Sequence, residues 1–318
     1  MPLRRLSPNA RGALLALGAF AVFSSHDVLV KLLGGSYSPI QIVFFSVLFS
    51  FPVLTLILAR SRTHGHLRPR HPWWSLARAI AAIVTGFCAF TAFSLLPLAQ
   101  TYALLFATPL LITVLSIPVL GEKVGVHRWA AVVVGLCGVL VVLRPNAVPL
   151  SAGHLAGLMA AAGSATASII VRKIGQEERS SVLILYPLLG NVLVMGALLP
   201  AVYKPMPLEH LGALAAIAVL SIIATSFIIF AYRTGEAAVV APMQYSQIVW
   251  ATLFGWLIFA EVPDLPTLLG AGIVIASGMY IVARESGARA TDNQPVLSTR
   301  TRHETGTYPR VSTLIDDD

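Results

Sequence analysis

Charged residues are scarce in this sequence. They account for 11% of its 318 residues, whereas soluble globular domains carry about a quarter. Hydrophobic residues account for 56%, and the mean hydropathy is +0.79. This composition excludes an ordinary soluble protein and is typical of a chain embedded in a lipid bilayer.

Cysteine is almost absent as well. Cys88 and Cys137 stand far apart, each inside an apolar stretch, so we expect neither a disulfide framework nor a zinc site. His64, His66 and His71 share a basic loop whose His-x-His spacing could ligate a metal, but no carboxylate or thiolate accompanies them. We favour a solvated loop near anionic lipid and predict no metal and no cofactor. No phosphate-binding loop motif occurs, so a transport cycle here would draw on a gradient or on exchange.

Long apolar segments fill most of the chain. A bilayer core about 30 Å thick requires roughly 20 helical residues, and ten segments approach this length, near residues 12–33, 38–59, 76–96, 100–120, 128–143, 153–171, 182–202, 211–232, 238–260 and 267–283. We therefore predict an all-α integral membrane protein with ten transmembrane helices. Three arginines before the first segment also fit a signal peptide, but the apolar character continues to Leu33, as an ordinary first span requires.

The distribution of Lys and Arg predicts the orientation. Of the 22 such residues, only Lys31, Arg144 and Lys204 fall in the predicted outer loops when the N-terminus is inside. Cytoplasmic loops collect Lys and Arg, so we expect residues 1–11 and a disordered tail, 285–318, in the cytoplasm. The net charge of +8 then belongs to scattered loops, and we predict no nucleic-acid partner.

The chain contains an internal repeat. At an offset near 140, Gly138 falls on Gly278 and Arg144 on Arg284, and the fourth span of each half ends in a small residue followed by Glu122 or Glu261. We divide the chain into halves 12–146 and 147–284, each with five spans. An odd number of spans forces the second half to enter with opposite polarity, which is the inverted-repeat plan of secondary transporters, with a central cavity between the halves.

In these features the chain resembles the EamA-type branch of the drug/metabolite transporter superfamily, over about residues 11–285. The segments His26 to Lys31 and Ser38 to Phe45 are similar to a bacterial subgroup that contains riboflavin-type and S-adenosylmethionine-type carriers. The resemblance implies a basket of helices around a cavity that opens alternately to each side of the bacterial inner membrane.

Ionisable groups inside the membrane are rare and therefore informative. Asp27 lies within the first span with His26 beside it, and Lys31 follows at i+4, where it can pair with Asp27. One interpretation is a structural ion pair at the end of the span. The other is a substrate or proton site, for which the titration range of His26 is suited.

Uncharged polar and aromatic side chains gather in the ninth span and its counterpart, the fourth. They can line a cavity for a flat or amphipathic solute, or they can hold helices together by hydrogen bonds. The candidates for substrate binding are Gln244, Tyr245, Gln247 and Trp250, with Gln100 and Tyr102.

Other residues suggest how the helices pack and bend. Small residues at four-residue spacing predict close approach of helices at Gly157, Ala161 and Ala165 and at Gly272, Ala276 and Tyr280. Prolines in or beside spans predict kinks and freed carbonyls at Pro97, Pro109, Pro118, Pro187 and Pro242. Glu122 and Glu261 are expected to cap or orient a neighbouring helix.

The sequence thus predicts a secondary transporter, not an enzyme, working as a monomer or homodimer in the lipid bilayer. Its substrate is a small polar metabolite, aromatic or zwitterionic, such as a riboflavin-like compound or an amino-acid derivative, with the proton as a candidate coupling ion. An integral-membrane enzyme acting on a lipid-linked substrate is the alternative; it would require a catalytic pair near one membrane face, and His26 and Asp27 should diverge as helix neighbours. A channel would require rings of like residues, which do not occur.

Overall fold

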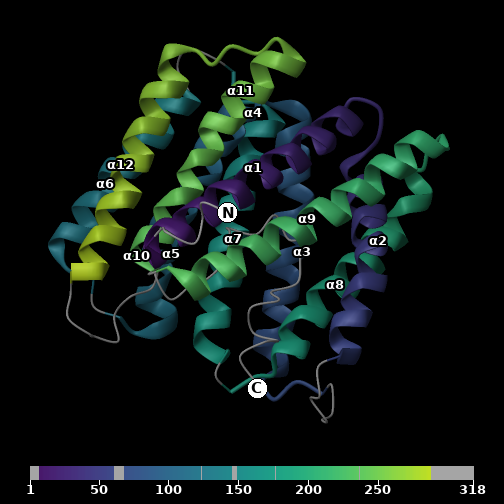
Figure 1. The fold of residues 1–318 in the computed structure, drawn as a ribbon, viewed down its shortest axis with the longest axis horizontal. Helices are drawn as coiled ribbons and strands as arrows, with labels where there is room; N and C mark the ends of the chain where they lie inside the picture. The colour runs from purple at the N-terminus through teal and green to yellow at the C-terminus, as the bar shows by residue number, and fades with distance from the viewer. Residues whose placement is uncertain are drawn as a thin grey trace.

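The computed structural model of the protein describes residues 7–60, 68–122, 124–144, 149–175, 177–235 and 237–287. Every regular element in these ranges is a helix (Figure 1). His64, His66 and the tail from residue 288 onward lie outside the described residues, and the last described helix runs to Gly287, past the predicted start of the tail.

The first half of the chain forms α1 (Pro8–Gly34), α2 (Pro39–Arg60), α3 (Pro72–Leu95), α4 (Leu98–Leu105), α5 (Thr108–Leu120) and α6 (Val126–Leu143). The second half forms α7 (Ala152–Ile174), α8 (Ser180–Leu198), η2 (Leu199–Ala201), α9 (Leu208–Thr234), α10 (Ala237–Val240), η3 (Ala241–Ser246), α11 (Gln247–Phe259) and α12 (Leu265–Gly287).

Eight helical segments of the described chain are long and apolar enough to cross a membrane, with α4 and α5 taken together as one of them. The predicted second and ninth spans do not meet this criterion. The apolar part of α2 is shorter, Pro39–Pro52, and the ninth span is divided into α10, η3 and α11. Ten spans therefore remain a prediction.

Two predicted spans are interrupted at prolines, as the sequence suggested. Pro109 stands in the first turn of α5 and Pro242 in the first turn of η3. A proline removes one helical N–H, and at the first break the Leu105 carbonyl instead accepts a hydrogen bond of 2.7 Å from the Thr108 hydroxyl. The fourth and ninth spans are therefore discontinuous helices.

The proline in α8 has a different compensation. Because Pro187 carries no N–H, the Leu183 carbonyl four residues earlier loses its helical donor. The buried guanidinium of Arg78 in α3 donates to this carbonyl from Nη1, and Asn191 donates to the Pro187 carbonyl at 3.0 Å. The carbonyl freed by this proline thus joins α8 to α3.

α5 and α11 end in the same way. Gly121 and Ala260 both adopt a left-handed conformation, with φ of 71° and 54°. The following residue then returns its N–H to a carbonyl six positions earlier, from Glu122 to Ser116 at 3.3 Å and from Glu261 to Gly255 at 2.9 Å. This shared ending places both glutamates at the turn that leaves the helix.

Contacts between the two halves are more extensive than those within either half. The largest packing surfaces join α1 with α9, α3 with α7 and α6 with α12. Figure 1 shows α6 and α12 side by side at one edge of the bundle and α1 beside α9. The halves are interleaved rather than stacked as separate units.

Glycines permit the closest of these approaches. A Cβ on Gly138 would lie 2.9 Å from the Gly270 carbonyl, and one on Gly270 would lie 2.6 Å from the Gly138 carbonyl. The predicted packing of Gly157 is confirmed, because its Cβ would meet Leu104 at 2.8 Å. The predicted close approach at Gly272 is wrong, since nothing lies within 4 Å of a Cβ there. The spacing of small residues predicted a close approach of α12 to another helix, but the residue that faces α6 is Gly270, and Gly272 lies on a different face of α12.

Candidate functional site

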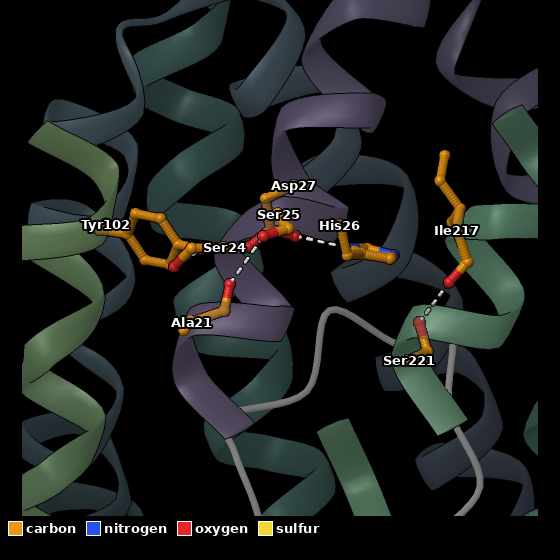
Figure 2. A network of polar contacts seen from close by, with 8 residues as sticks. All are labelled: Ala21, Ser24, Ser25, His26, Asp27, Tyr102, Ile217 and Ser221. Carbon is orange, nitrogen blue, oxygen red and sulfur yellow. Dashed lines mark hydrogen bonds and ion pairs between the residues drawn. The ribbon is translucent and has the colours of Figure 1, made fainter. Parts of the chain in front are cut away.

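A buried polar cluster lies two-thirds of the way along α1. Ser24, His26 and Asp27 are all 1% exposed or less. His26 Nδ1 and Asp27 Oδ1 are 2.7 Å apart, and the Tyr102 hydroxyl of α4 donates to Asp27 Oδ2. Figure 2 shows Tyr102 reaching Asp27 from one side of α1, while His26 points toward the side where Ser221 of α9 lies.

Two sequence-based expectations about this cluster are wrong. Adjacent residues of a helix diverge by about 100°, yet the short Asp27 side chain and the near ring nitrogen of His26 still meet in a hydrogen bond. Lys31 does not pair with Asp27: its Nζ lies 2.7 Å from Glu261 Oε1 and donates to the Leu96 carbonyl at 2.5 Å. Lys31 occupies the last turn of α1, where the end of α11 supplies a nearer carboxylate.

The cluster can hold a proton. A hydrogen bond between Asp27 Oδ1 and His26 Nδ1 requires one proton between the two atoms. A carboxylate so deeply buried needs hydrogen bonds to remain charged, and Tyr102 supplies one. The edge of His26 contacts the Phe90 ring, with centroids 6.2 Å apart. Acid, imidazole and phenol therefore form one continuous group inside an otherwise apolar region.

A row of aromatic rings leads from this cluster to the ninth span. Successive ring centroids are 5.4 Å apart from Phe93 to Tyr102, 6.1 Å from Tyr102 to Phe106 and 5.1 Å from Phe106 to Tyr245. Phe106 occupies the break between α4 and α5, and Tyr245 belongs to η3. The two discontinuous helices thus meet through these rings. Phe106 was not predicted from the sequence. It is nevertheless the residue of the first half that aligns with Tyr245 when the two repeats are aligned at Glu122 and Glu261.

Several polar atoms at the second break lack a protein partner. Gln244, Tyr245 and Gln247 are 8%, 5% and 4% exposed. Among the described residues, no hydrogen-bond partner contacts Ser246 Oγ, Gln247 Nε2 or Trp250 Nε1. Each buried donor without a partner costs about 1–3 kcal/mol, so a group of them is expected where a ligand supplies acceptors.

The aromatic side chains of this segment face different neighbours. The Tyr245 hydroxyl lies against Gly278 of α12, only 1.8 Å from where a Cβ would be. Trp250 stacks on Phe254 with centroids 6.3 Å apart and packs against the apolar cluster between α1 and α9. The ninth span therefore packs against α12 through Tyr245 and against the cluster between α1 and α9 through Trp250.

Gln100 lies away from these groups. Its side-chain amide is 3.0 Å from His154 Nε2. His154 Nδ1 accepts from the Ser151 N–H at 3.0 Å, so Nε2 carries the proton and the Gln100 carbonyl is the atom suited to face it. The amide also lines a small pocket with Thr252, Gly255 and Glu261, at the ends of α4 and α11. The sequence analysis did not single out His154, although Ser151 three residues earlier is a helix-capping signal.

Two glutamates connect the halves at the ends of helices. Glu261 accepts a hydrogen bond of 3.1 Å from the Leu98 N–H at the start of α4, which confirms that it caps a neighbouring helix. Glu122 forms an ion pair of 2.5 Å with Arg172 near the end of α7. Lys173 beside it donates to the Val119 carbonyl at 2.7 Å and lies over the Trp74 ring.

The EamA-like transporter family matches residues 10–144 and 151–283, once in each half. The chain is similar to a riboflavin transporter of Rhizobium johnstonii, with 28% identity over 76% of this chain and 78% of that protein. It is similar to a pseudopaline exporter of Pseudomonas aeruginosa, with 27% identity over 87% and 97%. It is also similar to an S-adenosylmethionine uptake transporter of Rickettsia bellii, with 27% identity over 83% and 91%.

The two family matches cover most of the chain, and the predicted resemblance is confirmed. The long apolar helices and the transporter relatives agree with one another. The chain therefore belongs to the EamA-like transporter family of the drug/metabolite transporter superfamily and is a multi-pass membrane transport protein.

Proposed function

We propose that the protein is a secondary carrier that moves a small polar metabolite across the bacterial inner membrane by alternating access. The observation that carries this proposal is the group of unpartnered polar atoms at the break in the ninth span, joined by aromatic rings to the buried Asp27 cluster. A carrier needs polar groups at mid-depth that only its solute completes, and discontinuous helices supply them.

The side chains favour a flat solute with acceptor oxygens or nitrogens. The Tyr245 and Trp250 rings make the surroundings aromatic, and Gln247 and Trp250 offer donors that no hydrogen-bond partner contacts among the described residues. Asp27 would attract an ammonium or other cationic group. These features agree with the sequence-based prediction of an aromatic or zwitterionic metabolite, and relatives are named for riboflavin and for S-adenosylmethionine. We assign Gln244, Tyr102 and His26 to the same lining, and Gln100 to the entrance beside the pocket.

The arrangement of helices favours ten spans in two inverted halves. The pairing of α1 with α9 has its counterpart in that of α3 with α7, as expected if the first helix of each half packs on the third helix of the other. The matching left-handed ends of α5 and α11 support the same symmetry. From the Lys and Arg distribution we propose that both chain ends lie in the cytoplasm.

We further propose the proton as coupling ion, bound between Asp27 and His26. Both side chains are fully buried and share a hydrogen bond. Binding of a proton would change the charge of the cluster by one unit, which is the change that a proton-coupled cycle uses.

Flux measurements in proteoliposomes test the carrier. Radiolabelled riboflavin, S-adenosylmethionine and aromatic amino-acid derivatives are offered separately, with and without the same unlabelled solute inside. A carrier shows saturable uptake that internal solute stimulates. Gln247→Ala should reduce it about tenfold, because the solute loses a donor worth about 1–3 kcal/mol, whereas the exposed variant Glu209→Gln should not. Turnover of a lipid-linked substrate without counterflow of any solute would favour the membrane enzyme instead.

A further inference from the structure

Among the ion pairs that join the halves in the described residues, two are mostly buried. Lys31, in the last turn of α1, pairs with Glu261 at 2.7 Å, and their side chains are 11% and 24% exposed. Arg172, in the last turn of α7, pairs with Glu122 at 2.5 Å, and their side chains are 15% and 11% exposed. In each case the cation ends the first helix of one half and the anion follows the fourth span of the other half.

The two pairs lie at opposite ends of the bundle, as their contacts with α3 show. Lys31 donates to the carbonyl of Leu96, immediately after α3 ends. Lys173, next to Arg172, lies 4.6 Å above the ring of Trp74 near the start of α3. A helix of 24 residues is about 36 Å long, which is comparable to the thickness of the membrane core.

The pair Lys31–Glu261 also holds the helices that carry the proposed site. Glu261 accepts from the Leu98 N–H, one turn before Tyr102 on α4. Lys31 lies one turn after Asp27 on α1. The pair Lys31–Glu261 therefore fixes the two helices whose side chains meet in the Tyr102–Asp27 hydrogen bond.

A partly buried ion pair of this kind has two favourable states: the two charged groups are in contact, or both are fully hydrated. Separating the charges without water leaves each one unpaired in a poorly solvated place, which is costly. A pair therefore breaks when its end of the bundle opens to water and forms again when that end closes.

From these observations we infer that Lys31–Glu261 and Arg172–Glu122 are the two latches of the transport cycle, each closing one end of the path. This inference rests on the proposed alternating-access carrier. Lys31 then acts as a positioning residue rather than as a contact of the solute, which revises the role predicted from the sequence.

Distances between spin labels in the full-length protein, reconstituted in lipid nanodiscs, test the latches without a transported solute. Cys88 and Cys137 are first replaced by alanine. One label pair, at Leu32 and Val262, reports the end with Lys31; another, at Val126 and Glu177, reports the end with Arg172. All four label positions are exposed.

Lys31→Gln should raise the population with a longer Leu32–Val262 distance about fivefold or more, without lengthening the other distance. Glu122→Gln should have the reverse effect. The conservative variant Lys31→Arg, which keeps the charge and a donor for the Leu96 carbonyl, should retain the parental distribution. Asp264→Asn breaks an ion pair to Arg144 that joins α6 and α12, and should change neither distance.

The inference is overturned if both single variants leave the distances unchanged, or if each lengthens both distances together, as general loosening would. Solute flux in the same samples separates this outcome from failure of the carrier itself. Saturable counterflow with unchanged distances would refute the latches alone, whereas absence of counterflow in the parent protein would refute the proposed function.

Discussion

Asp27 is the residue on which the proposed coupling depends, because its carboxyl is fully buried and bonded to His26 and Tyr102. Asp27→Asn keeps a side chain that can hydrogen-bond but cannot bind a proton. We expect solute accumulation driven by an imposed pH gradient to fall to simple equilibration, while exchange of labelled for unlabelled solute continues. Flux in proteoliposomes with and without the gradient measures both. Undiminished accumulation in this variant would exclude the proton site.

Asp264 offers a test of pH dependence outside the spans. Hydrogen bonding from the Thr267 side chain is the largest cause that lowers the pKa of Asp264 below its usual 3.8, and the ion pair with Arg144 adds to it. A lowered folded pKa means that this carboxylate stabilises the fold above its unfolded pKa and loses that effect as pH falls through the folded pKa. Asp264→Asn should therefore weaken the decline of melting temperature below about pH 4. An equally steep decline in the variant would contradict this.

The rarity of polar residues in the apolar spans directed attention to side chains that the structure buries. Asp27, Tyr245 and Gln247 drew attention because polar groups are uncommon in apolar spans, and the structure buries all three. The true partner of Lys31 could not be predicted in this way. Glu261 is more than two hundred positions distant, and only the packing of α11 against α1 brings it near.

At the scale of elements, α3 is linked to α8 because Pro187 has no N–H for the Leu183 carbonyl, which accepts from Arg78 instead. Arg78→Met should destabilise the protein by about 2 kcal/mol, because the Leu183 carbonyl then loses its charged donor. In a Pro187→Ala background the alanine N–H can serve that carbonyl, so the same Arg78 substitution should cost less. Thermal unfolding of the four proteins in detergent gives the coupling, and strictly additive losses would refute the compensation.

Two glycines of α12 form a matched pair for testing helix packing. Gly270→Ala forces a methyl group against the Gly138 carbonyl and the Val142 N–H, and should cost about 1–3 kcal/mol. Gly272→Ala meets open space and should be neutral or slightly stabilising, because alanine favours the helix. Melting temperatures of both variants decide the matter; equal losses would mean that the α6–α12 approach is looser than described.

Helix positions were largely predictable from the sequence, but their interruptions were only partly so. Pro109 and Pro242 indicated where the fourth and ninth spans would bend. That the second break would become a 3-10 segment beside unpartnered polar groups depends on its packing against α1 and α12. Periodicity alone also could not distinguish Gly270 from Gly272, since both fit a small-residue pattern.

For the whole molecule, the interleaved halves predict mutual dependence. The largest packing surfaces join the halves, so residues 1–148 expressed alone should be degraded or aggregate. Co-expression with residues 149–318 should restore a complex that purifies as one species and transports solute. A first half that is monodisperse in detergent by itself would contradict this. The repeat itself was visible in the sequence, whereas the interleaving was not, because it depends on contacts between distant segments.

The same interleaving affects how the protein is made. Helices of the first half leave the ribosome before the partners that cover them exist, and α1 and α3 carry Asp27, His26 and Arg78 on faces that the finished protein buries. Until α8 and α9 are synthesised, the Leu183 carbonyl is not there to accept from Arg78, and the side of α1 toward which His26 points is not covered by α9. Biogenesis should therefore require an insertase or translocon that retains the early helices and shields them during translation of the rest of the chain.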